Sequence, residues 1–498
     1  MLEVFASAIS QLMGNVTYLG SLVSGTLLGL FFGVLPGLGG TICLALLLPF
    51  TWGFDPFAVM YMFSGVIGSV MVGGSVTSIL VNIPGTGGNL ATILEGYPMA
   101  QKGEAGRAIS IAAIASGLGG LLGIAWLMLL LPIVVALIMS FAAPEICMMI
   151  LVGLATIVVA ARGNMIKGLI MGGVGMLLSF IGFSDTTGVP RYTGGTMYLW
   201  DGIALIPFIL GIFAISEVMV LVRRGEAVAK LKPGTLAHRW DNAVDGFKTI
   251  LKHKLCLVRS SAIGAAVGIV PGIGGAVATL LSYIAEMQSS KHPERFGKGV
   301  PEGLIASEAA NDAKDGGALL STVAFGLPGS AEFVMLLAAF IMHGFTPGPT
   351  LLKEHLDLVV SLIVGLTFSD ILSALIVLVA SKELSKASTI QPYYIAPIVT
   401  VLCLVGVFAN RQEILDIPLV VLLGFFSYKL RQDGFPTLPL VIGFILGGLF
   451  EHSLLQSLMM SYGEYSIFFN RPIALGLFVL AVITLVLPWV RERVLRKK

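Results

Sequence analysis

Two short motifs that join proline to glycine occur twice in the sequence, and they are the strongest candidates for a binding site. GLFFGVLPGLGG at 29–40 corresponds to GAAVGIVPGIGG at 264–275, and SILVNIPGT at 78–86 corresponds to TVAFGLPGS at 322–330. Proline ends a helix and glycine lets the backbone turn with positive φ, so each motif predicts a broken helix. A helix that begins after such a break offers free N–H groups to a carboxylate, and freed carbonyl oxygens suit Na⁺.

Hydroxyl and amide side chains surround the second motif pair. Such groups hydrogen-bond a carboxylate without a buried charge, which would cost about 3 kcal/mol or more at mid-membrane. The alternative is that they only cap the broken helices, and both roles can coexist. We expect the substrate between 82–89 and 326–332. The candidate substrate-binding residues, together with two from the charged segment described below, are Asn82, Pro84, Gly85, Thr86, Gly87, Pro328, Gly329, Ser330, Asn311 and Lys314.

The PGxGG turns are the candidate ion sites, with Na⁺ as the only metal ion considered. The alternative is packing alone, because glycine recurs every four residues before each turn, and such a row permits close helix contact. The candidate ion-binding residues are Gly37, Gly39, Gly40, Gly272, Gly274, Gly275 and Asp312.

The segment SEAANDAKDGG at 307–317 is the most charged stretch beside an apolar one. Asn311 and Asp312 offer oxygen ligands to a cation, and Lys314 offers a positive charge to an anionic substrate. The alternative is a cytoplasmic loop with a solvated face.

Composition places these motifs in a membrane. The chain has 498 residues, of which 56% are hydrophobic and only 12% charged, and its mean hydropathy is +0.94. A soluble protein of this length needs a charged surface, and a disordered one has far less apolar content. The 30 basic and 28 acidic residues nearly balance and give no sign of a nucleic-acid partner. We therefore expect an all-α polytopic membrane protein in a lipid bilayer.

Apolar stretches of helical length predict about 11–13 membrane segments. The stretch 16–50 would reach about 52 Å as one helix, well beyond one crossing, so it is expected to be a helix, a break and a half-helix. For 257–283 a re-entrant path is favoured over two crossings. The stretches lie at about 16–50, 57–83, 108–140, 144–161, 165–183, 201–222, 257–283, 317–343, 356–380, 393–409, 414–428, 436–458 and 472–490.

The motif pairs, with a third pair FILG at 208–211 and 444–447, predict two structural repeats. Basic residues mark cytoplasmic loops, and placing the basic linker and tail inside makes the repeats inverted, with the N-terminus outside. Inverted repeats with paired broken helices are typical of secondary transporters. The expected organisation is a first repeat at 1–222, a cytoplasmic linker at 223–256, a second repeat at 257–462, and an extra helix and basic tail at 463–498.

Other chemistry has little support in the sequence. The four cysteines form no CxxC pair, no HExxH occurs, and no phosphate-binding loop is present. We assign no catalytic residue and no cofactor apart from a coupling Na⁺ or H⁺. An intramembrane enzyme and an anion-selective channel are the competing hypotheses.

The chain resembles the large membrane subunit of the tripartite tricarboxylate transporter family, the TctA type. The resemblance covers nearly the whole length and rests on six motifs. These are GVLPGLGG at 33–40, NIPGTGG at 82–88, GIVPGIGG at 268–275, EAANDAKDGGAL at 308–319, GLPGS at 326–330 and GFTPGP at 344–349.

This resemblance implies a secondary importer of small carboxylates, of the tricarboxylate or dicarboxylate class, in a bacterial inner membrane. Uptake would be driven by an ion gradient, with alternating access at the paired breaks. The implied partners are a small membrane subunit of the TctB type and a periplasmic solute-binding protein of the TctC type.

Overall fold

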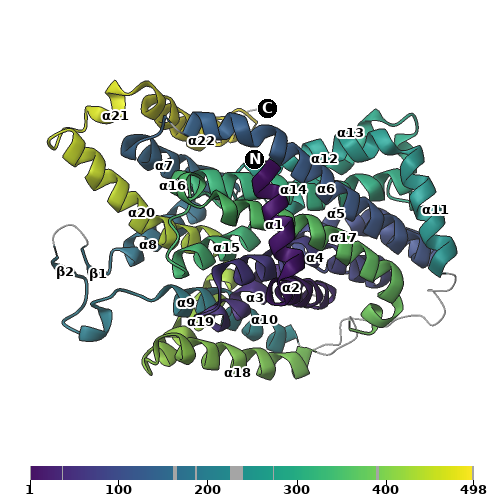
Figure 1. Ribbon diagram of the computed structural model, residues 1–498, viewed down its shortest axis with the longest axis horizontal. Helices are drawn as coiled ribbons and strands as arrows, with labels where there is room; N and C mark the ends of the chain where they lie inside the picture. Colours follow the sequence, from purple (N-terminus) through teal and green to yellow (C-terminus); the bar gives the residue numbers. More distant parts are fainter. Residues whose placement is uncertain are drawn as a thin grey trace.

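The computed structural model describes residues 2–35, 37–138, 140–160, 165–184, 188–224, 239–272, 274–387 and 392–495 (Figure 1). Helices dominate this part of the chain, and its one strand pairing joins β1 (Gly182–Phe183) to β2 (Pro190–Arg191) in antiparallel register. The all-α prediction is therefore confirmed. Pro36 and residues 225–238 of the predicted linker lie outside the described residues.

The first half runs from the N-terminus to the linker as a succession of helices interrupted by short breaks. Its helices are α1 (Leu2–Gly14), α2 (Val16–Val34), α3 (Gly39–Leu47), η1 (Leu48–Thr51), α4 (Pro56–Val81), η2 (Gly87–Asn89), α5 (Leu90–Gln101), α6 (Ala105–Ile138), α7 (Ala143–Ala160), α8 (Met165–Ser179), η3 (Met197–Leu199), α9 (Leu205–Ile209), the π-helix η4 (Leu210–Ile215) and α10 (Ser216–Arg224).

The second half shows the same succession of long helices and breaks. Its helices are α11 (Arg239–Lys252), α12 (Lys254–Ile269), α13 (Gly274–Ser289), η5 (Pro293–Arg295), α14 (Pro301–Phe325), α15 (Ala331–Met342), α16 (Pro349–Glu354), α17 (Leu356–Ala387), α18 (Pro392–Arg411), α19 (Asp416–Gln432), α20 (Leu438–Met460), α21 (Ile467–Asn470) and α22 (Pro472–Leu495).

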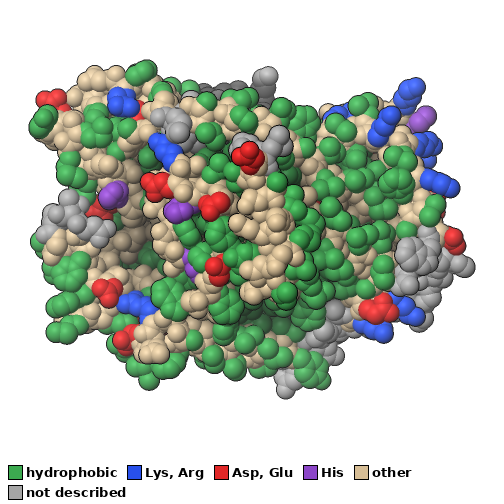
Figure 2. Space-filling view, viewed as in Figure 1, with side chains coloured by type: hydrophobic (Ala, Val, Ile, Leu, Met, Phe, Trp, Pro, Cys, Tyr) green, Lys and Arg blue, Asp and Glu red, His purple; other side chains and the backbone are tan. Residues whose placement is uncertain are grey.

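Seven helices of the described residues are long and apolar enough to cross a membrane, and five shorter apolar helices accompany them. The outer surface agrees with this assignment. In Figure 2 hydrophobic side chains cover much of the visible face, and many of the Lys and Arg side chains gather at the end that carries α11 and α13. The chain is therefore a multi-pass membrane protein. The seven long spans are Val16–Val34, Pro56–Val81, Ala105–Ala136, Leu205–Arg223, Leu356–Leu384, Tyr394–Arg411 and Leu438–Met460.

The predicted helix breaks occur at both PGxGG motifs. α2 ends at Val34 and α3 begins at Gly39, while α12 ends at Ile269 and α13 begins at Gly274. Corresponding glycines on the two turns have positive φ, which a side chain would strain. These are Gly37 at 87° and Gly39 at 60° in the first turn, and Gly272 at 75° and Gly274 at 70° in the second. The prediction of a helix, a break and a half-helix within 16–50 is confirmed.

The second motif pair also breaks its helices at matching positions. Asn82 ends α4 with φ of 60°, and Gly326 ends α14 with φ of 67°. Three residues later, Gly85 and Gly329 each lie against another glycine or alanine and a carbonyl oxygen. A Cβ on Gly85 would lie 2.6 Å from the Gly33 oxygen, and one on Gly329 would lie 2.5 Å from the Gly268 oxygen.

Glycine rows let the broken helices approach their neighbours. A Cβ on Gly33 would lie 2.2 Å from the Val70 oxygen of α4, and one on Gly268 would lie 2.0 Å from the Lys314 oxygen of α14. α2 therefore packs closely along α4, and α12 along α14. The packing role proposed for these glycine rows is confirmed.

The long helices of the two halves also pack crosswise. α6 of the first half packs along α14 of the second, where Gly119 meets Ala309 and Gly123 meets Ala313. α17 of the second half packs along α4 of the first, where Ser369 donates to the Gly65 oxygen at 2.8 Å. Each half thus supplies a helix that covers the core of the other.

A second group of helices, drawn from α7–α10 and α18–α22, adjoins this core. Here too the packing is crosswise, because α8 packs along α20 and η4 packs along α19. Ion pairs tie the elements together: Arg191 binds Glu451 through two nitrogen–oxygen contacts, and Arg471 binds the buried Glu145 at 2.5 Å. The inverted orientation of the halves and the boundaries of the four predicted segments stay predictions.

Candidate functional site

The charged segment 307–317 lies inside α14, and its side chains are buried. Glu308 is 0% exposed, Asp312 3%, Lys314 1% and Asp315 5%. The alternative reading of this segment as a solvated cytoplasmic loop is therefore wrong. Alanines and a glycine at 306, 309, 310, 313 and 316 recur at helical spacing, which lets α6 and α12 pack tightly around these charges. Among the described residues Lys314 is the one Lys or Arg with less than a tenth of its surface exposed.

The break at 82–89 and the second PGxGG turn meet at Asn311. A Cβ on Gly88 would lie 2.1 Å from Asn311 Oδ1, and a Cβ on Gly275 would lie 3.0 Å from that oxygen and 3.2 Å from Gly88 Cα. The same Cβ would lie 2.7 Å from Lys314 Cε. We call this group of four residues, Gly88, Gly275, Asn311 and Lys314, the polar crossing.

The polar groups of the polar crossing are poorly satisfied inside the protein. Neither the amide nitrogen nor the oxygen of Asn311 has a hydrogen-bond partner among the described residues, although the side chain is fully buried. Lys314 Nζ donates to Asp315 Oδ1, and Asp315 Oδ2 is left without a partner. Buried polar groups in native proteins are normally paired, so an unpartnered amide beside an ammonium group indicates a place for a ligand.

Two helix N-termini converge on the polar crossing. Gly275 lies in the first turn of α13, and Gly88 lies in the short helix that leads directly into α5. The N-terminus of a helix carries free N–H groups and partial positive charge. The arrangement of two such ends, one amide and one ammonium group suits an anion with planar oxygens, such as a carboxylate.

The corresponding crossing made by the first PGxGG turn has different chemistry. A Cβ on Gly40 of α3 would lie 3.0 Å from Val70 Cγ1 and 3.1 Å from Glu332 Cγ of α15. Val70 thus occupies the place that Lys314 has at the polar crossing. Glu332, 9% exposed, accepts a hydrogen bond from Ser330 at 2.7 Å. This second crossing thus contains the carboxylate of Glu332 and has Val70 in place of the basic side chain of the first.

The contacts therefore join the four breaks crosswise. The 82–89 break meets the 270–275 turn, and the helix after the 326–330 break meets the helix after the 35–38 turn. Within the second half, the Gly272 N–H donates to the Pro328 oxygen at 3.3 Å. Of the predicted substrate residues, the structure brings Asn311 and Lys314 together beside the 82–89 break.

The remaining predicted site residues of the 82–89 break have structural roles that are visible. Thr86 and Asn89 form a capping box in which both the Thr86 N–H and its hydroxyl bind Asn89 Oδ1, at 3.2 and 2.6 Å. The Asn89 amide nitrogen in turn donates to the Met71 oxygen at 3.1 Å. Asn82 and Gly87 are exposed, and Pro84 is partly buried. Helix capping is thus present here, as the alternative interpretation allowed.

Glu308 holds three helices together and was missed by the sequence interpretation. Its carboxylate accepts hydrogen bonds from Ser75 of α4 at 2.6 Å, from Ser116 of α6 at 2.8 Å, and from Thr92 of α5. These hydroxyls lie 192 to 233 positions away along the chain, so sequence spacing gives no sign of them. The one available signal was an acid within a run of small residues.

Asp312 and Asp370 add two further buried acids near α6. Both oxygens of Asp312 lack hydrogen-bond partners among the described residues. Asp370 of α17 is 5% exposed and lies against glycine surfaces, because a Cβ on Gly120 would be 2.1 Å from its Oδ2 and one on Gly68 would be 2.7 Å from its Oδ1. The burial of Asp370 is inconsistent with a place at the lipid–water interface.

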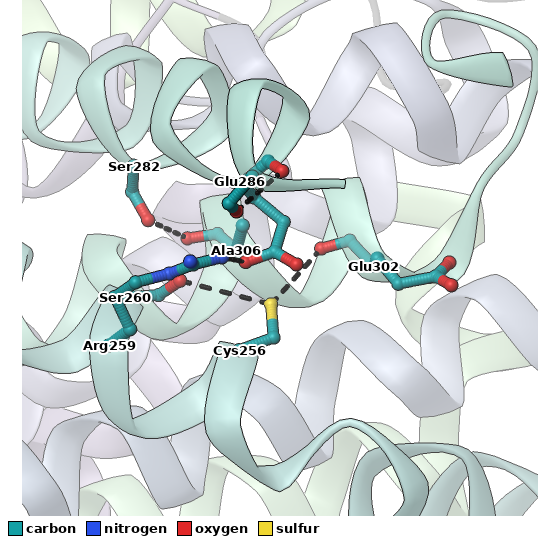
Figure 3. Close-up of polar contacts among 8 residues, drawn as sticks. Cys256, Arg259, Ser260, Ser282, Glu286, Glu302 and Ala306 are labelled. Carbon is teal, nitrogen blue, oxygen red and sulfur yellow. Dashed lines mark hydrogen bonds and ion pairs between the residues drawn. The ribbon is translucent and has the colours of Figure 1, made fainter. Parts of the chain in front are cut away.

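The α12–α13 hairpin that positions Gly275 is held by polar contacts at its other end (Figure 3). Arg259 of α12 binds Glu286 of α13, and Ser282 of α13 donates to the Ala306 oxygen of α14 at 2.9 Å. The fully buried Glu95 of α5 accepts from the Tyr283 hydroxyl at 2.7 Å, and its carboxylate also accepts from three backbone N–H groups of the loop before α14. These contacts fix α13 and α5 relative to α14.

The described residues offer little support for metal binding or thiol chemistry. Among the described residues no group of three or more His, Cys, Asp and Glu side chains is arranged to hold a metal ion. The four cysteines are free and buried.

A sequence profile of the tripartite tricarboxylate transporter TctA family matches residues 19–442. The chain belongs to the TctA family. The match includes both motif pairs and all of α14, so the polar crossing lies wholly within the family region. As a TctA-family protein, the chain is a membrane component of a tripartite tricarboxylate transporter, and proteins of this family work with other components of that system.

Two proteins of Agrobacterium vitis are similar to this TctA-family chain. An uncharacterised 52.8 kDa protein of the TAR-I ttuC′ 3′ region is 32% identical over 472 residues, covering 94% of this chain and 93% of the relative. An uncharacterised protein of the TAR-II ttuC′ 3′ region is 29% identical over 233 residues, covering 46% of this chain and 96% of the relative. No solved structure gives a significant match to the chain.

Proposed function

We propose that the chain is the permease subunit of a secondary transporter that imports small di- or tricarboxylates across a bacterial inner membrane. The polar crossing binds one substrate carboxylate. Lys314 supplies the positive charge, the Asn311 amide donates to a carboxylate oxygen, and the N-termini of α13 and α5 supply backbone N–H groups. The observation that carries this proposal is the buried, unpartnered Asn311 beside the buried Lys314 at two helix N-termini.

The remaining parts of the proposal follow the family and the charge pattern. A periplasmic solute-binding protein of the TctC type delivers the substrate, and a small TctB-type subunit completes the complex. The N-terminus is periplasmic and the C-terminus cytoplasmic. A Na⁺ or H⁺ gradient drives uptake, and freed carbonyl oxygens at the PGxGG turns are the proposed Na⁺ ligands. Alternating access moves the crosswise-packed helices relative to the second helix group.

The test is uptake of labelled citrate and succinate into proteoliposomes that contain the chain with its two partner components. Na⁺ and pH gradients are imposed separately, and exchange of labelled for unlabelled substrate is measured without any gradient. We expect saturable exchange and gradient-driven accumulation of at least one carboxylate. If neither exchange nor accumulation is seen for any carboxylate tried, the proposal of a carboxylate transporter is refuted. An anion conductance that saturates neither with a steeper ion gradient nor with higher substrate concentration would instead indicate a channel.

A further inference from the structure

The cation that is proposed to bind the substrate already has an internal carboxylate as its partner. Lys314 and Asp315 are neighbours on α14, and Nζ donates to Asp315 Oδ1 although both side chains are buried. Asp315 Oδ2 has no hydrogen-bond partner among the described residues. The pair is therefore neutral as a whole, but Asp315 relies on Lys314 for compensation of its charge.

Other charged groups around Asp315 are acids. Asp312 on the same helix, Glu332 of α15 and Asp370 of α17 all act on Asp315 by repulsion. α4 carries no charged residue. The paired charges of the other helices packed against α14 have their own partners elsewhere. These are Arg107 of α6 with Glu104 and Asp245, Arg259 of α12 with Glu286 of α13, and Glu95 of α5 with Tyr283 and backbone N–H groups.

A substrate carboxylate at the polar crossing competes with Asp315 for Lys314. Once Lys314 turns to the substrate, Asp315 is a buried carboxylate without a cation and with acids on several sides. An ionised group in this position is strongly disfavoured, and protonation removes the charge. A sodium ion is a poor substitute, because it would lie beside the Lys314 ammonium group, whereas a neutral carboxylic acid tolerates that neighbour.

Resting on the carboxylate-binding function proposed above, we propose that Asp315 is the proton acceptor that couples substrate binding to a proton gradient. The ion pair between Lys314 and Asp315, one substrate carboxylate and one proton become an ion pair between Lys314 and the substrate, together with neutral Asp315. Charge is conserved, and one proton is taken up for each carboxylate that Lys314 binds. Release of the substrate returns the proton.

The first test measures binding of citrate and succinate to the purified complex at mildly alkaline pH, where both ligands are fully ionised. Because binding consumes a proton, Kd should rise with pH by up to about tenfold per pH unit. A pH indicator in weakly buffered solution should report uptake of about one proton per carboxylate bound to the wild-type protein. Binding without proton uptake would overturn the proposal, whatever the variants show.

The second test compares Asp315→Asn with Asp416→Asn. Asp416 is an equally buried aspartate in the second helix group, where it accepts from Tyr198 at 2.6 Å. We expect Asp315→Asn to bind the carboxylate several-fold more tightly, because the competitor has lost its charge, and to show a Kd independent of pH. In proteoliposomes this variant should exchange substrate but no longer accumulate it on a pH gradient. Asp416→Asn should retain the pH dependence of the wild type.

Failure of this inference differs from failure of the proposed function. Accumulation by wild-type protein on a Na⁺ gradient alone, with a Kd independent of pH, would retain the transporter and overturn the role of Asp315. Accumulation on a pH gradient by Asp315→Asn would do the same. Absence of carboxylate binding and exchange in the wild type would overturn both.

Discussion

Phe208 stacks on Phe444, with ring centroids 3.9 Å apart and ring planes inclined by 19°. The two residues occupy the same place in the two FILG tetrapeptides, at 208–211 and 444–447. Residues that a repeat matches to each other can touch only close to the axis that relates the copies. The stack therefore supports such an axis between α9 and α20, and its direction in the membrane stays a prediction.

The stack should appear as an energetic coupling in a double-mutant cycle. Phe208→Leu and Phe444→Leu each remove one ring, and the double variant removes both. We expect the two losses in unfolding free energy to be non-additive by about 0.5–1.5 kcal/mol, the usual size of an aromatic pair. Denaturant titration in detergent micelles measures each value, and strict additivity would contradict a direct interaction.

Lys314→Met should weaken carboxylate binding. The change removes a charge-assisted hydrogen bond worth about 1.5–3 kcal/mol, so Kd should rise roughly tenfold to hundredfold. Lys102→Met is the control, because Lys102 is exposed and donates to the Lys298 oxygen. Isothermal titration with citrate and succinate compares the two, and equal affinities would rule out Lys314 as a substrate ligand.

Gly88→Ala should disturb the polar crossing through Asn311. The new Cβ would lie 2.1 Å from Asn311 Oδ1, so the amide has to move. We expect a loss of carboxylate affinity in the folded protein, and no further loss when Gly88→Ala is added to Asn311→Ala. Gly476→Ala in α22 is the matched control, since nothing lies within 4 Å of its Cβ position. Size-exclusion chromatography checks folding, and additive effects would argue against the contact.

Glu308→Ala should destabilise the protein more than the loss of a partly exposed acid does. The change leaves the hydroxyls of Ser75, Thr92 and Ser116 without their shared acceptor, and each unsatisfied buried group costs about 1–3 kcal/mol. The comparison is Glu302→Ala at the start of the same helix, where the side chain is 31% exposed. The measurement is the thermal midpoint in detergent, and similar shifts for both variants would contradict the bridging role.

Cysteine labelling tests the inverted topology. A thiol reagent that cannot cross the membrane, added to the periplasmic side, should label Lys353→Cys but not Lys382→Cys. The four native cysteines are buried and should give little background. The opposite labelling pattern would show that the repeats are not inverted as predicted.

The helix breaks were predictable because their cause is local. Proline and positive-φ glycine act on the backbone within one turn, so the ends of α2 and α12 follow directly from the PGxGG motifs. The αL conformation of Asn82, matched by Gly326, follows from the same kind of local preference.

The partners within the site were not predictable, because they depend on contacts between distant segments. Sequence reasoning found Asn311 and Lys314 but not the crosswise meeting of their helix with Gly88 and Gly275. The charges of α14 lower its hydropathy, so the sequence gives no sign that this helix is buried along nearly its whole length. An isolated acid such as Asp370 looks the same in sequence whether it faces headgroups or glycine surfaces inside the protein.

The crosswise packing of α6 on α14 and of α17 on α4 has a consequence for biosynthesis. When the ribosome has inserted α4, the helix that covers Gly68 is still about three hundred residues from being made. The polar and glycine-lined surfaces of the first half therefore remain uncovered in the bilayer until the second half is inserted. The tertiary structure of the first half forms only after that insertion. Such long-range closure is slow and leaves the nascent chain open to misassembly and proteolysis.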